Sequence, residues 1–269
     1  TQLTLGESIE RALQKNPRIL EAKENLNQAR SGVREAISGF LPSLSFTGMY
    51  NFAEKTQRIR FPSPLTGQME EFDVDFTRDY SLQFTLSQTI YSGGRLSASY
   101  SIARQAESIA QSNLKSVENE VVFDVVQAFY SVLLAKASIE VIEEAIRTAE
   151  EHLRVARARY EAGEASHYEV MRAEVEVANL KPNLISAQNH LRLAKLHLRN
   201  LLAIPPDEEI SIVGSFEEVE LPISLNQAVE KALSLRPELL ILRMQKVIAK
   251  ESLRLAKAGR IPYQYAGQL

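Results

Sequence analysis

Hydrophobic residues recur in a heptad pattern through the middle of the chain. Residues 95–162 contain neither Gly nor Pro, and a continuous helix of that length would span about 100 Å. Apolar positions in its second half are spaced alternately four and three apart, which predicts a coiled-coil seam with a partner along its length. The seam consists of Val121, Val125, Ala128, Val132, Ala135, Ile139, Ile142, Ile146, Ala149, Leu153, Ala156 and Tyr160.

A second helix with the same spacing is predicted over residues 166–203. Because a short turn joins the two segments, they should form an antiparallel helical hairpin. Many seam residues are Ala, which lets the two backbones approach closely. Pro182 lies off the seam and should kink the second helix mildly. The second seam consists of Val170, Ala173, Val177, Leu180, Leu184, Ala187, Leu191, Ala194, Leu198 and Leu201.

From Ser43 the hydrophobic period changes from that of a helix to that of a strand. Residues 44–52 and 80–87 alternate apolar with small polar side chains, which is typical of a membrane strand with lipid on one face and water on the other. We predict a long external loop between them, about Glu54 to Asp79, which holds the acidic residues Glu70, Glu71, Asp73 and Asp75. Two strands cannot close a barrel, so subunits must combine.

Aromatic residues gather in the same region: 11 of the 19 Phe and Tyr residues lie between Phe40 and Tyr100. Such clustering is expected of the interfacial girdles of a membrane barrel. The alternative is an ordinary soluble hairpin with an aromatic core. The longest apolar helical run, 121–135, contains Asp124 and should be too short and too polar to span a membrane.

Two shorter helices are predicted before the strands. One covers residues 5–15, and the next begins at Pro17, with Asn16 as its N-cap, and ends near Ser38. Gly39 is expected to cap its C-terminus, and Pro42 prevents the helix from continuing. After the strands, Ser92-Gly93-Gly94 should turn the chain into the long helix, with Ser92 as the cap.

A second apolar face flanks the heptad seam in the middle of the long helix, formed by Val122, Val126, Phe129 and Leu133. We expect residues 1–16 and 204–236 to cover it.

Residues 4–42 recur as residues 224–262 at a constant offset of 220 without a gap. The short helix, the break before Pro17 or Pro237, the second helix and the Gly-x-x-Pro exit appear in the same order. Because the second copy stops where its strands should begin, we expect the sequence to be a truncated form of a longer chain with two repeats.

Composition narrows the function classes. A net charge of −3 and a pI near 5.9 give no reason to expect nucleic-acid binding. The absence of cysteine excludes disulfides, thiolate metal sites and thiol nucleophiles from these residues. No phosphate-binding loop, metal cluster or catalytic constellation is visible, so we expect neither an enzyme nor a cofactor.

The turn between the two long helices is predicted from its capping residues. Gly163 is placed to end the first helix in the left-handed conformation, and Ser166 with Glu169 has the spacing of a capping box for the second. These roles by themselves require no function.

Together these segments resemble the TolC-like outer-membrane efflux protein family. The resemblance rests on the Leu-Thr-Leu to Asn-Pro opening, the Gly-x-Leu-Pro-Ser-Leu segment at 39–44, the segment 86–94, the Arg-Tyr-x-x-Gly-x-x-Ser turn at 159–166 and the tandem repeat. It covers essentially the whole sequence. Ser92 stands where the family often has Asp, which is a minor exchange of caps.

The resemblance implies a mainly α fold with a β-hairpin. Long antiparallel coiled-coil helices would form an α-barrel tunnel, and the strands would join a trimeric transmembrane β-barrel. The implied parts are residues 1–42 (equatorial and upper tunnel helices), 43–91 (transmembrane hairpin with external loop), 92–203 (long periplasmic hairpin), 204–222 (equatorial linker) and 223–269 (start of the second repeat).

The implied function is a passive exit duct in the outer membrane of a Gram-negative bacterium, in a tripartite efflux or type I secretion system. The implied partners are two further copies in a homotrimer, outer-membrane lipid, an inner-membrane transporter and a periplasmic adaptor. We expect the adaptor to dock at the helical turn, on Arg159, Gly163, Glu164, Ala165, Ser166 and Glu169. Gate residues cannot be assigned, because the family usually carries them in the second half.

Two alternatives come from other classes. The heptad seams alone would suit a soluble coiled-coil scaffold or adaptor, although this explains neither the strands nor the repeat. Glu164 and His167 have the Glu-x-x-His spacing of di-iron bundles, but such a site needs further carboxylates from facing helices. His152, His190 and His197 have no acidic partner at ligand spacing and are expected to be solvated.

Overall fold

A computed structural model describes residues 2–52, 57–62, 67–74, 78–216, 222–259 and 264–265. Its contacts divide the chain into two compact units. The first unit comprises residues 1–29 and 107–244, and the second comprises residues 30–106 and 245–269. Three helices, α2, α3 and α6, run from one unit into the other.

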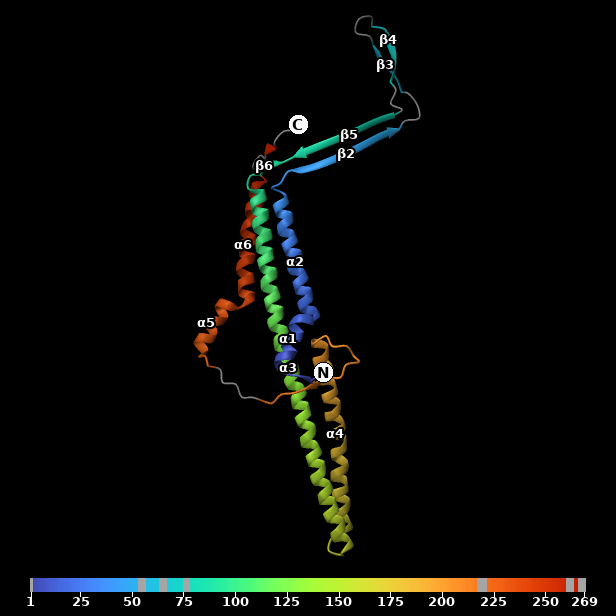
Figure 1. Ribbon diagram of the computed structural model, residues 1–269, viewed down its shortest axis with the longest axis vertical. Coiled ribbons are helices and arrows are strands. Elements are labelled where there is room, and N and C mark those ends of the chain that lie inside the picture. The colour runs from blue at the N-terminus through green and yellow to red at the C-terminus, as the bar shows by residue number, and fades with distance from the viewer. Residues whose placement is uncertain are drawn as a thin grey trace. The chain divides into compact units, whose positions relative to one another are not determined.

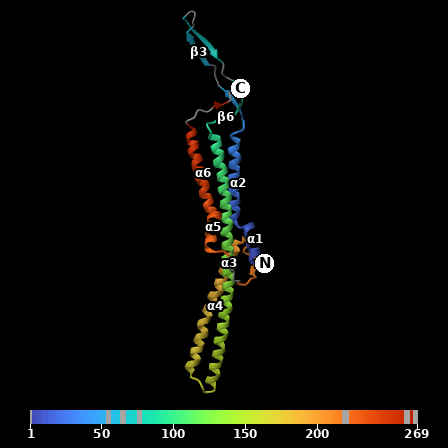
Figure 2. The same cartoon turned by 90° about the vertical axis from the view of Figure 1, so that its left-hand side faces the viewer.

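The elements follow in chain order, and Figures 1 and 2 label most of them. They are β1 (Gln2–Leu3), α1 (Leu5–Lys15), α2 (Pro17–Ser38), β2 (Ser43–Phe52), β3 (Gln57–Pro62), β4 (Met69–Val74), β5 (Arg78–Ser87), β6 (Thr89–Tyr91), α3 (Arg95–Glu161), α4 (His167–Leu201), β7 (Ser211–Ile212), α5 (Leu225–Leu235), α6 (Pro237–Ala258) and β8 (Gln264–Tyr265).

In the first unit, α4 returns antiparallel alongside α3, and both views show the two helices side by side. The predicted seams line their contact: every seam residue except Tyr160 is buried or partly buried. Val125 and Val132 of α3 and Val177 and Leu198 of α4 are among the buried ones. The helical hairpin and its heptad pairing are therefore confirmed. Pro182 lies inside α4, as expected.

The core of the first unit forms around the second apolar face of α3. Phe129 and Leu133 are buried with residues from the N-terminal segment and from the segment after α4, including Leu3, Leu202 and Ile212. Strand β1 pairs in parallel with β7, and the Val213 N–H donates to the Leu3 carbonyl at 3.0 Å. This arrangement confirms the expected cover for residues 2–16 and 204–216.

The rest of the expected cover is absent from this core. Helix α5 lies within the predicted range 204–236, but it contains no buried residue, and its Leu225, Val229 and Leu233 are exposed. Residues 217–221 lie outside the described part of the chain. The prediction was wrong for α5 because an amphipathic pattern does not say which helix the apolar face will meet.

By length and apolar composition alone, α3 would qualify as a membrane-spanning helix, contrary to the expectation that its apolar run is too short and polar. The packing gives that run another role. Val121, Val125 and Phe129 are buried in a protein core, as in a central helix covered on two sides.

In the second unit, β2 and β5 form an antiparallel hairpin from the pair Ser43–Ser87 to the pair Phe52–Arg78. This confirms the predicted strands. The rings of Phe46 and Phe84 lie 4.7 Å apart between centroids, so the apolar side chains share one face. That face is uncovered: Leu44 is 70% and Leu82 is 67% exposed.

The predicted external loop is wrong as a loop. It contains β3 and β4, which pair from Gln57–Val74 to Pro62–Met69. Strand β4 contains Glu70, Glu71 and Asp73 of the acidic cluster, and Asp75 lies outside the described residues. The Arg60 guanidinium lies 2.5 Å from the Glu71 carboxylate on the neighbouring strand. Opposite charges placed across two strands stabilise such a pair, which a search for turn residues does not detect.

The internal repeat is confirmed by the helices. Helices α5 and α6 have the same lengths as α1 and α2, 11 and 22 residues, and begin and end 220 positions later. Both short helices carry a capping box, Thr4–Glu7 and Ser224–Gln227. Glu7 has a lowered pKa because its carboxylate accepts hydrogen bonds from the Thr4 backbone and hydroxyl. Strand β8, which follows α6 as β2 follows α2, pairs with β6.

The glycines predicted at helix ends lie just before α3 and just after α2. Gly93 and Gly94 have positive φ and Ser92 caps α3, since its hydroxyl accepts from the Leu96 N–H at 3.2 Å. Helix α2 ends at Ser38, so Gly39 directly follows its last residue as predicted, without a positive φ. A Cβ at Gly39 would lie 2.9 Å from Leu96 Cδ2, a terminal methyl group that can move, so Gly39 packs closely against the side chain at the start of α3.

Candidate functional site

The hairpin tip contains the predicted docking residues, and its geometry comes from two helix caps. Gly163 has φ +80°. Its N–H donates to the Tyr160 carbonyl at 2.9 Å, and the Glu164 N–H donates to the Arg159 carbonyl at 2.8 Å. These two bonds form a Schellman motif, which ends α3 at the glycine as predicted.

The cap of α4 follows three residues later. The Ser166 hydroxyl accepts from the Glu169 N–H at 3.4 Å. The Glu169 carboxylate contacts the Ser166 hydroxyl at 3.5 Å, and no bond returns to the Ser166 backbone, so the predicted capping box is half formed. Five of the six predicted docking residues are exposed, and Ala165 is partly buried. The tip is therefore a compact turn with a free polar surface.

Two exposed ion pairs lie near the tip, one between the two helices and one along α3. Arg157 of α3 contacts Glu174 of α4 at 2.7 Å. Along α3, Arg154 forms a close ion pair with Glu151, which lowers the pKa of that carboxyl group and raises that of the guanidinium. Since these groups are exposed, each pair contributes little to stability.

The metal-site alternative finds no support in the described residues, which contain no group of three His, Cys, Asp or Glu residues suited to a metal ion. The His167 ring instead lies 5.5 Å from the Tyr160 ring, between centroids. His152, His190 and His197 are exposed, as predicted.

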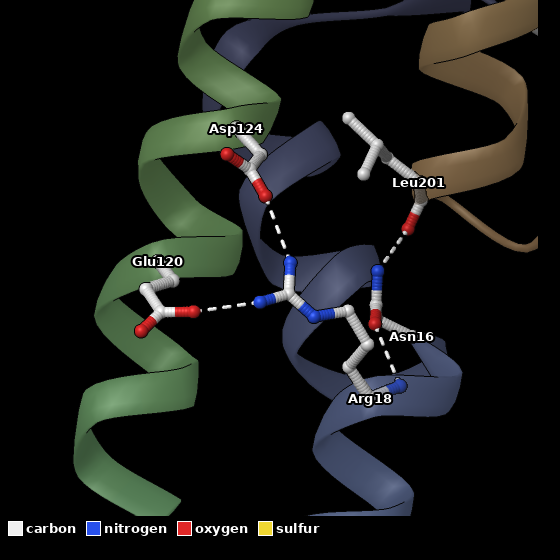
Figure 3. Close-up of polar contacts among 5 residues, drawn as sticks. All are labelled: Asn16, Arg18, Glu120, Asp124 and Leu201. Carbon is white, nitrogen blue, oxygen red and sulfur yellow. Dashed lines mark hydrogen bonds and ion pairs between the residues drawn. The ribbon is translucent and has the colours of Figure 1, made fainter.

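A second polar feature, the helical joint, lies where the bend between α1 and α2 meets the end of α4 (Figure 3). Asn16 is only 3% exposed. Its Oδ1 accepts from the Arg18 N–H at 2.9 Å, which caps α2, and its Nδ2 donates to the Leu201 carbonyl at 2.8 Å, which satisfies the end of α4. One buried asparagine therefore joins two helix ends.

Arg18 ties this joint to the long helix. Its guanidinium contacts Glu120 at 2.6 Å and Asp124 at 2.9 Å, both on α3 (Figure 3). Sequence reasoning identified Asn16 as an N-cap but missed its second bond and the Arg18 clamp. The four-residue spacing of Glu120 and Asp124 places them on one face, but nothing in the sequence indicates which cation they meet.

Sequence reasoning also missed a second seam on α4, which we call the outer seam. Its residues stand two positions before those of the seam that faces α3, and therefore about 200° around the helix. They are apolar and exposed, with Tyr168 69%, Val175 57% and Ile185 60% exposed. The signal was present in the sequence as a second 3-4 spacing: Tyr168, Met171, Val175, Ala178, Pro182 and Ile185.

A family model described as outer membrane efflux protein matches residues 8–203. The chain belongs to this family. It is therefore an outer-membrane protein of Gram-negative bacteria, and its helical hairpin, joint and most of its strands lie within the matched range.

Two curated relatives illustrate the range of this family. The chain is 24% identical over 230 residues to the outer membrane protein TolC of Escherichia coli, which covers 86% of this chain and 44% of TolC. It is 28% identical over 140 residues to the cobalt-zinc-cadmium resistance protein CzcC of Cupriavidus metallidurans, covering 52% of this chain and 33% of CzcC. The chain thus spans less than half the length of these relatives.

Solved structures support the fold. The CmeC outer membrane channel of Campylobacter jejuni superposes with a TM-score of 0.77 over 97% of this chain and 54% of CmeC, at 17% identity. At this identity the likeness concerns architecture alone. It confirms that the mainly helical, long-helix arrangement is that of outer membrane channels such as CmeC.

Because the Asn16 side chain forms two hydrogen bonds in the helical joint, its substitution should lower the stability of the protein. Asn16→Asp keeps the acceptor for the Arg18 N–H but removes the donor to the Leu201 carbonyl, so the free energy of unfolding should fall by about 1–3 kcal/mol. Asn16→Ala removes both bonds and should cost about 1 kcal/mol more. Urea unfolding of the detergent-solubilised protein measures both. The exposed control Asn179→Asp should stay within about 0.5 kcal/mol; an Asn16→Asp variant as stable as the control would contradict the role of this side chain.

Proposed function

We propose that the protein is a passive exit duct of the outer membrane, in a tripartite efflux or type I secretion system. The observation that carries this proposal is the uncovered apolar face of the β2–β5 hairpin in a chain that also contains a 67-residue helix. A soluble scaffold has no use for such a strand face. Residues 43–91 would then serve as the transmembrane part, residues 92–203 as the periplasmic tunnel wall, and the helices of both repeats with residues 204–222 as the upper tunnel and equatorial belt.

The strands require copies of the chain. Two strands leave unpaired edges that lipid cannot satisfy, so a barrel must close through several subunits. We infer a homotrimer with a combined β-barrel surrounded by outer-membrane lipid. Leu82 would face lipid and its neighbour Gln83 would face the water-filled interior.

A charge on the lipid face should therefore be selectively harmful. Leu82→Lys should cost about 2–4 kcal/mol of membrane stability if the residue lies near the midplane, and its level in extracted outer membranes should fall several-fold. Gln83→Lys, one residue away, should insert normally. Equal levels of the two variants, or recovery of the unmodified protein in the soluble fraction, would favour the scaffold alternative.

The outer seam of α4 supports assembly of the helices as well. Its exposed apolar residues have heptad spacing opposite the seam that α3 covers, so α4 has faces for two neighbouring helices. A helix with two opposite seams belongs in a continuous wall. We infer that further helices of the trimer cover the outer seam and close the tunnel.

Charging this seam should weaken the trimer. Val175→Asp combined with Ile185→Asp places two carboxylates where apolar contacts are proposed, and the trimer fraction in size-exclusion chromatography with light scattering should fall at least tenfold. The helical content of the subunit should remain near normal because both residues are exposed in the single chain. Asn179→Asp, on a different face of α4, is the matched control; a trimer unaffected by the double substitution would exclude the seam as an interface.

The hairpin tip is the proposed docking surface for a periplasmic adaptor, which would hold the tunnel open and connect it to an inner-membrane transporter. Exposure and rigidity support this role: two helix caps define the turn, and Arg159, Glu164 and Glu169 present both charge signs on its surface. Because no catalytic group is assigned, the energy for transport would come from that transporter. The name of CzcC mentions cobalt, zinc and cadmium resistance, whereas that of TolC mentions no cargo, so the cargo does not follow from the family.

Substitution at the left-handed glycine tests docking. Gly163→Val is strained at φ +80° and should alter the turn, abolishing drug tolerance of the native host while trimer levels stay near normal. Ala162→Val, one residue earlier in the same turn but without a positive φ, should retain most of the tolerance. Unchanged tolerance in Gly163→Val would count against the docking role.

A further inference from the structure

An uncharged groove lies between α3 and α4 within the first unit, and we call it the neutral groove. Its volume is about 590 Å³, which is within the range of sites for drug-sized molecules. Three serines, an asparagine and a histidine line it together with apolar side chains. The lining residues are Ser131, Leu134, Ala135, Ser138 and Ile142 of α3 and Asn183, Ser186, Ala187, His190 and Ala194 of α4.

The groove arises from small residues in the helical seam. Ala135, Ala187 and Ala194 occupy seam positions where other turns of the hairpin carry Val, Leu or Ile. Their short side chains leave space between two closely packed backbones. Leu134, which is 61% exposed, adds apolar surface at the side.

The hydrogen-bonding groups of the groove include both acceptors and donors. The Ser131 and Ser138 hydroxyls donate to the carbonyls of Gln127 and Leu134 at 2.8 and 2.9 Å, so their oxygens remain available as acceptors. The Asn183 amide and the His190 imidazole provide donors. None of the lining residues is Asp, Glu, Lys or Arg.

Other grooves in the same unit differ in this respect. The groove on the other side of α4 is lined by Arg192, Lys195 and Glu208, and that between α2 and α3 by Arg18 and Glu21. A divalent cation needs carboxylate, thiolate or clustered imidazole ligands, and an anion needs a cation or several aligned donors. The neutral groove favours neither.

The groove lies beside the seam that faces α3 and away from the outer seam of α4. Asn183, Ser186 and His190 stand one residue before the seam that faces α3, so they lie about 100° from that seam and from the outer seam. The opposite side of α4 meets the segment after α4, because Arg192 and Lys195 line one groove with Pro206 and Ile210. The neutral groove therefore opens on the face of the hairpin away from this segment.

We propose that the neutral groove binds an uncharged, amphipathic organic molecule of drug size, with its apolar part against the alanines and a polar atom at Asn183 or His190. If the proposed duct is correct, the cover wraps the outside of the tunnel and the groove faces its interior. The occupant is then cargo in transit. The binding chemistry itself rests on the groove alone.

Benzophenone is a suitable probe, since it is neutral, has one carbonyl acceptor and crosslinks to nearby C–H groups under light. Irradiated with the purified protein in its native oligomer, it should label the tryptic peptides 116–136, 137–147 and 173–192 in a saturable manner. A trimethylammonium derivative of benzophenone should label them at least fivefold less, because the groove has no carboxylate to pair with the cation.

Ser186→Trp fills the groove and should reduce labelling at least fivefold, whereas Gln188→Trp, on the opposite side of the same helix, should not. Labelling that is uniform along the chain, non-saturable or unchanged by Ser186→Trp would show that the probe reacts non-specifically and would overturn the proposal. So would equal labelling by the cationic derivative. If Ser186→Trp disrupts the oligomer and the groove of the unsubstituted protein is never labelled, a neighbouring helix occupies the groove. That result would also overturn the proposal. The oligomer size and membrane extraction of the same samples test the duct separately.

Discussion

The structure depends on burying one side of a very long helix. A helix of 67 residues has most of its hydrogen bonds within itself, but in water its stability comes mainly from packing an apolar face. In its lower part, α3 has one such face, and α4 covers it through the heptad seam. Between Val121 and Leu133 it has two, and the N-terminal segment and the segment after α4 complete the core. The positions of α4, the N-terminal segment and the segment after α4 follow from these two requirements.

Covering α3 with shorter helices creates a problem at their ends, which the joint solves. The last carbonyls of α4 and the first N–H groups of α2 lack partners within their own helices. Asn16 has one donor and one acceptor in its side chain and satisfies both ends while buried. In the second copy of the repeat the corresponding residue is Arg236, so the two copies share their helix lengths but not the chemistry of this joint.

The faces of α4 divide its tasks. One seam faces α3, the outer seam is uncovered in the single chain, a basic side meets the segment after α4, and the neutral groove lies on the remaining side. This division is possible because each residue turns the helix by about 100°, so four functions can run in parallel along one helix. A helix with seams on two opposite sides suits the continuous wall that we propose.

Local and periodic features were predictable from the sequence alone. The heptad spacing determined the helical hairpin, the alternation from Ser43 determined the strands, and the offset of 220 determined the second pair of short helices, because each depends on contacts that recur at a fixed interval. Caps at Gly163 and Ser92 followed from backbone and side-chain chemistry within a few residues. The tertiary structure decided what depends on residues far apart. Gly39 packs against Leu96, Arg58 and Arg60 meet an acidic strand where a loop was expected, Asn16 reaches Leu201, and three alanines leave a groove. Packing and partner choice are set by distances in space, which no single periodic pattern encodes.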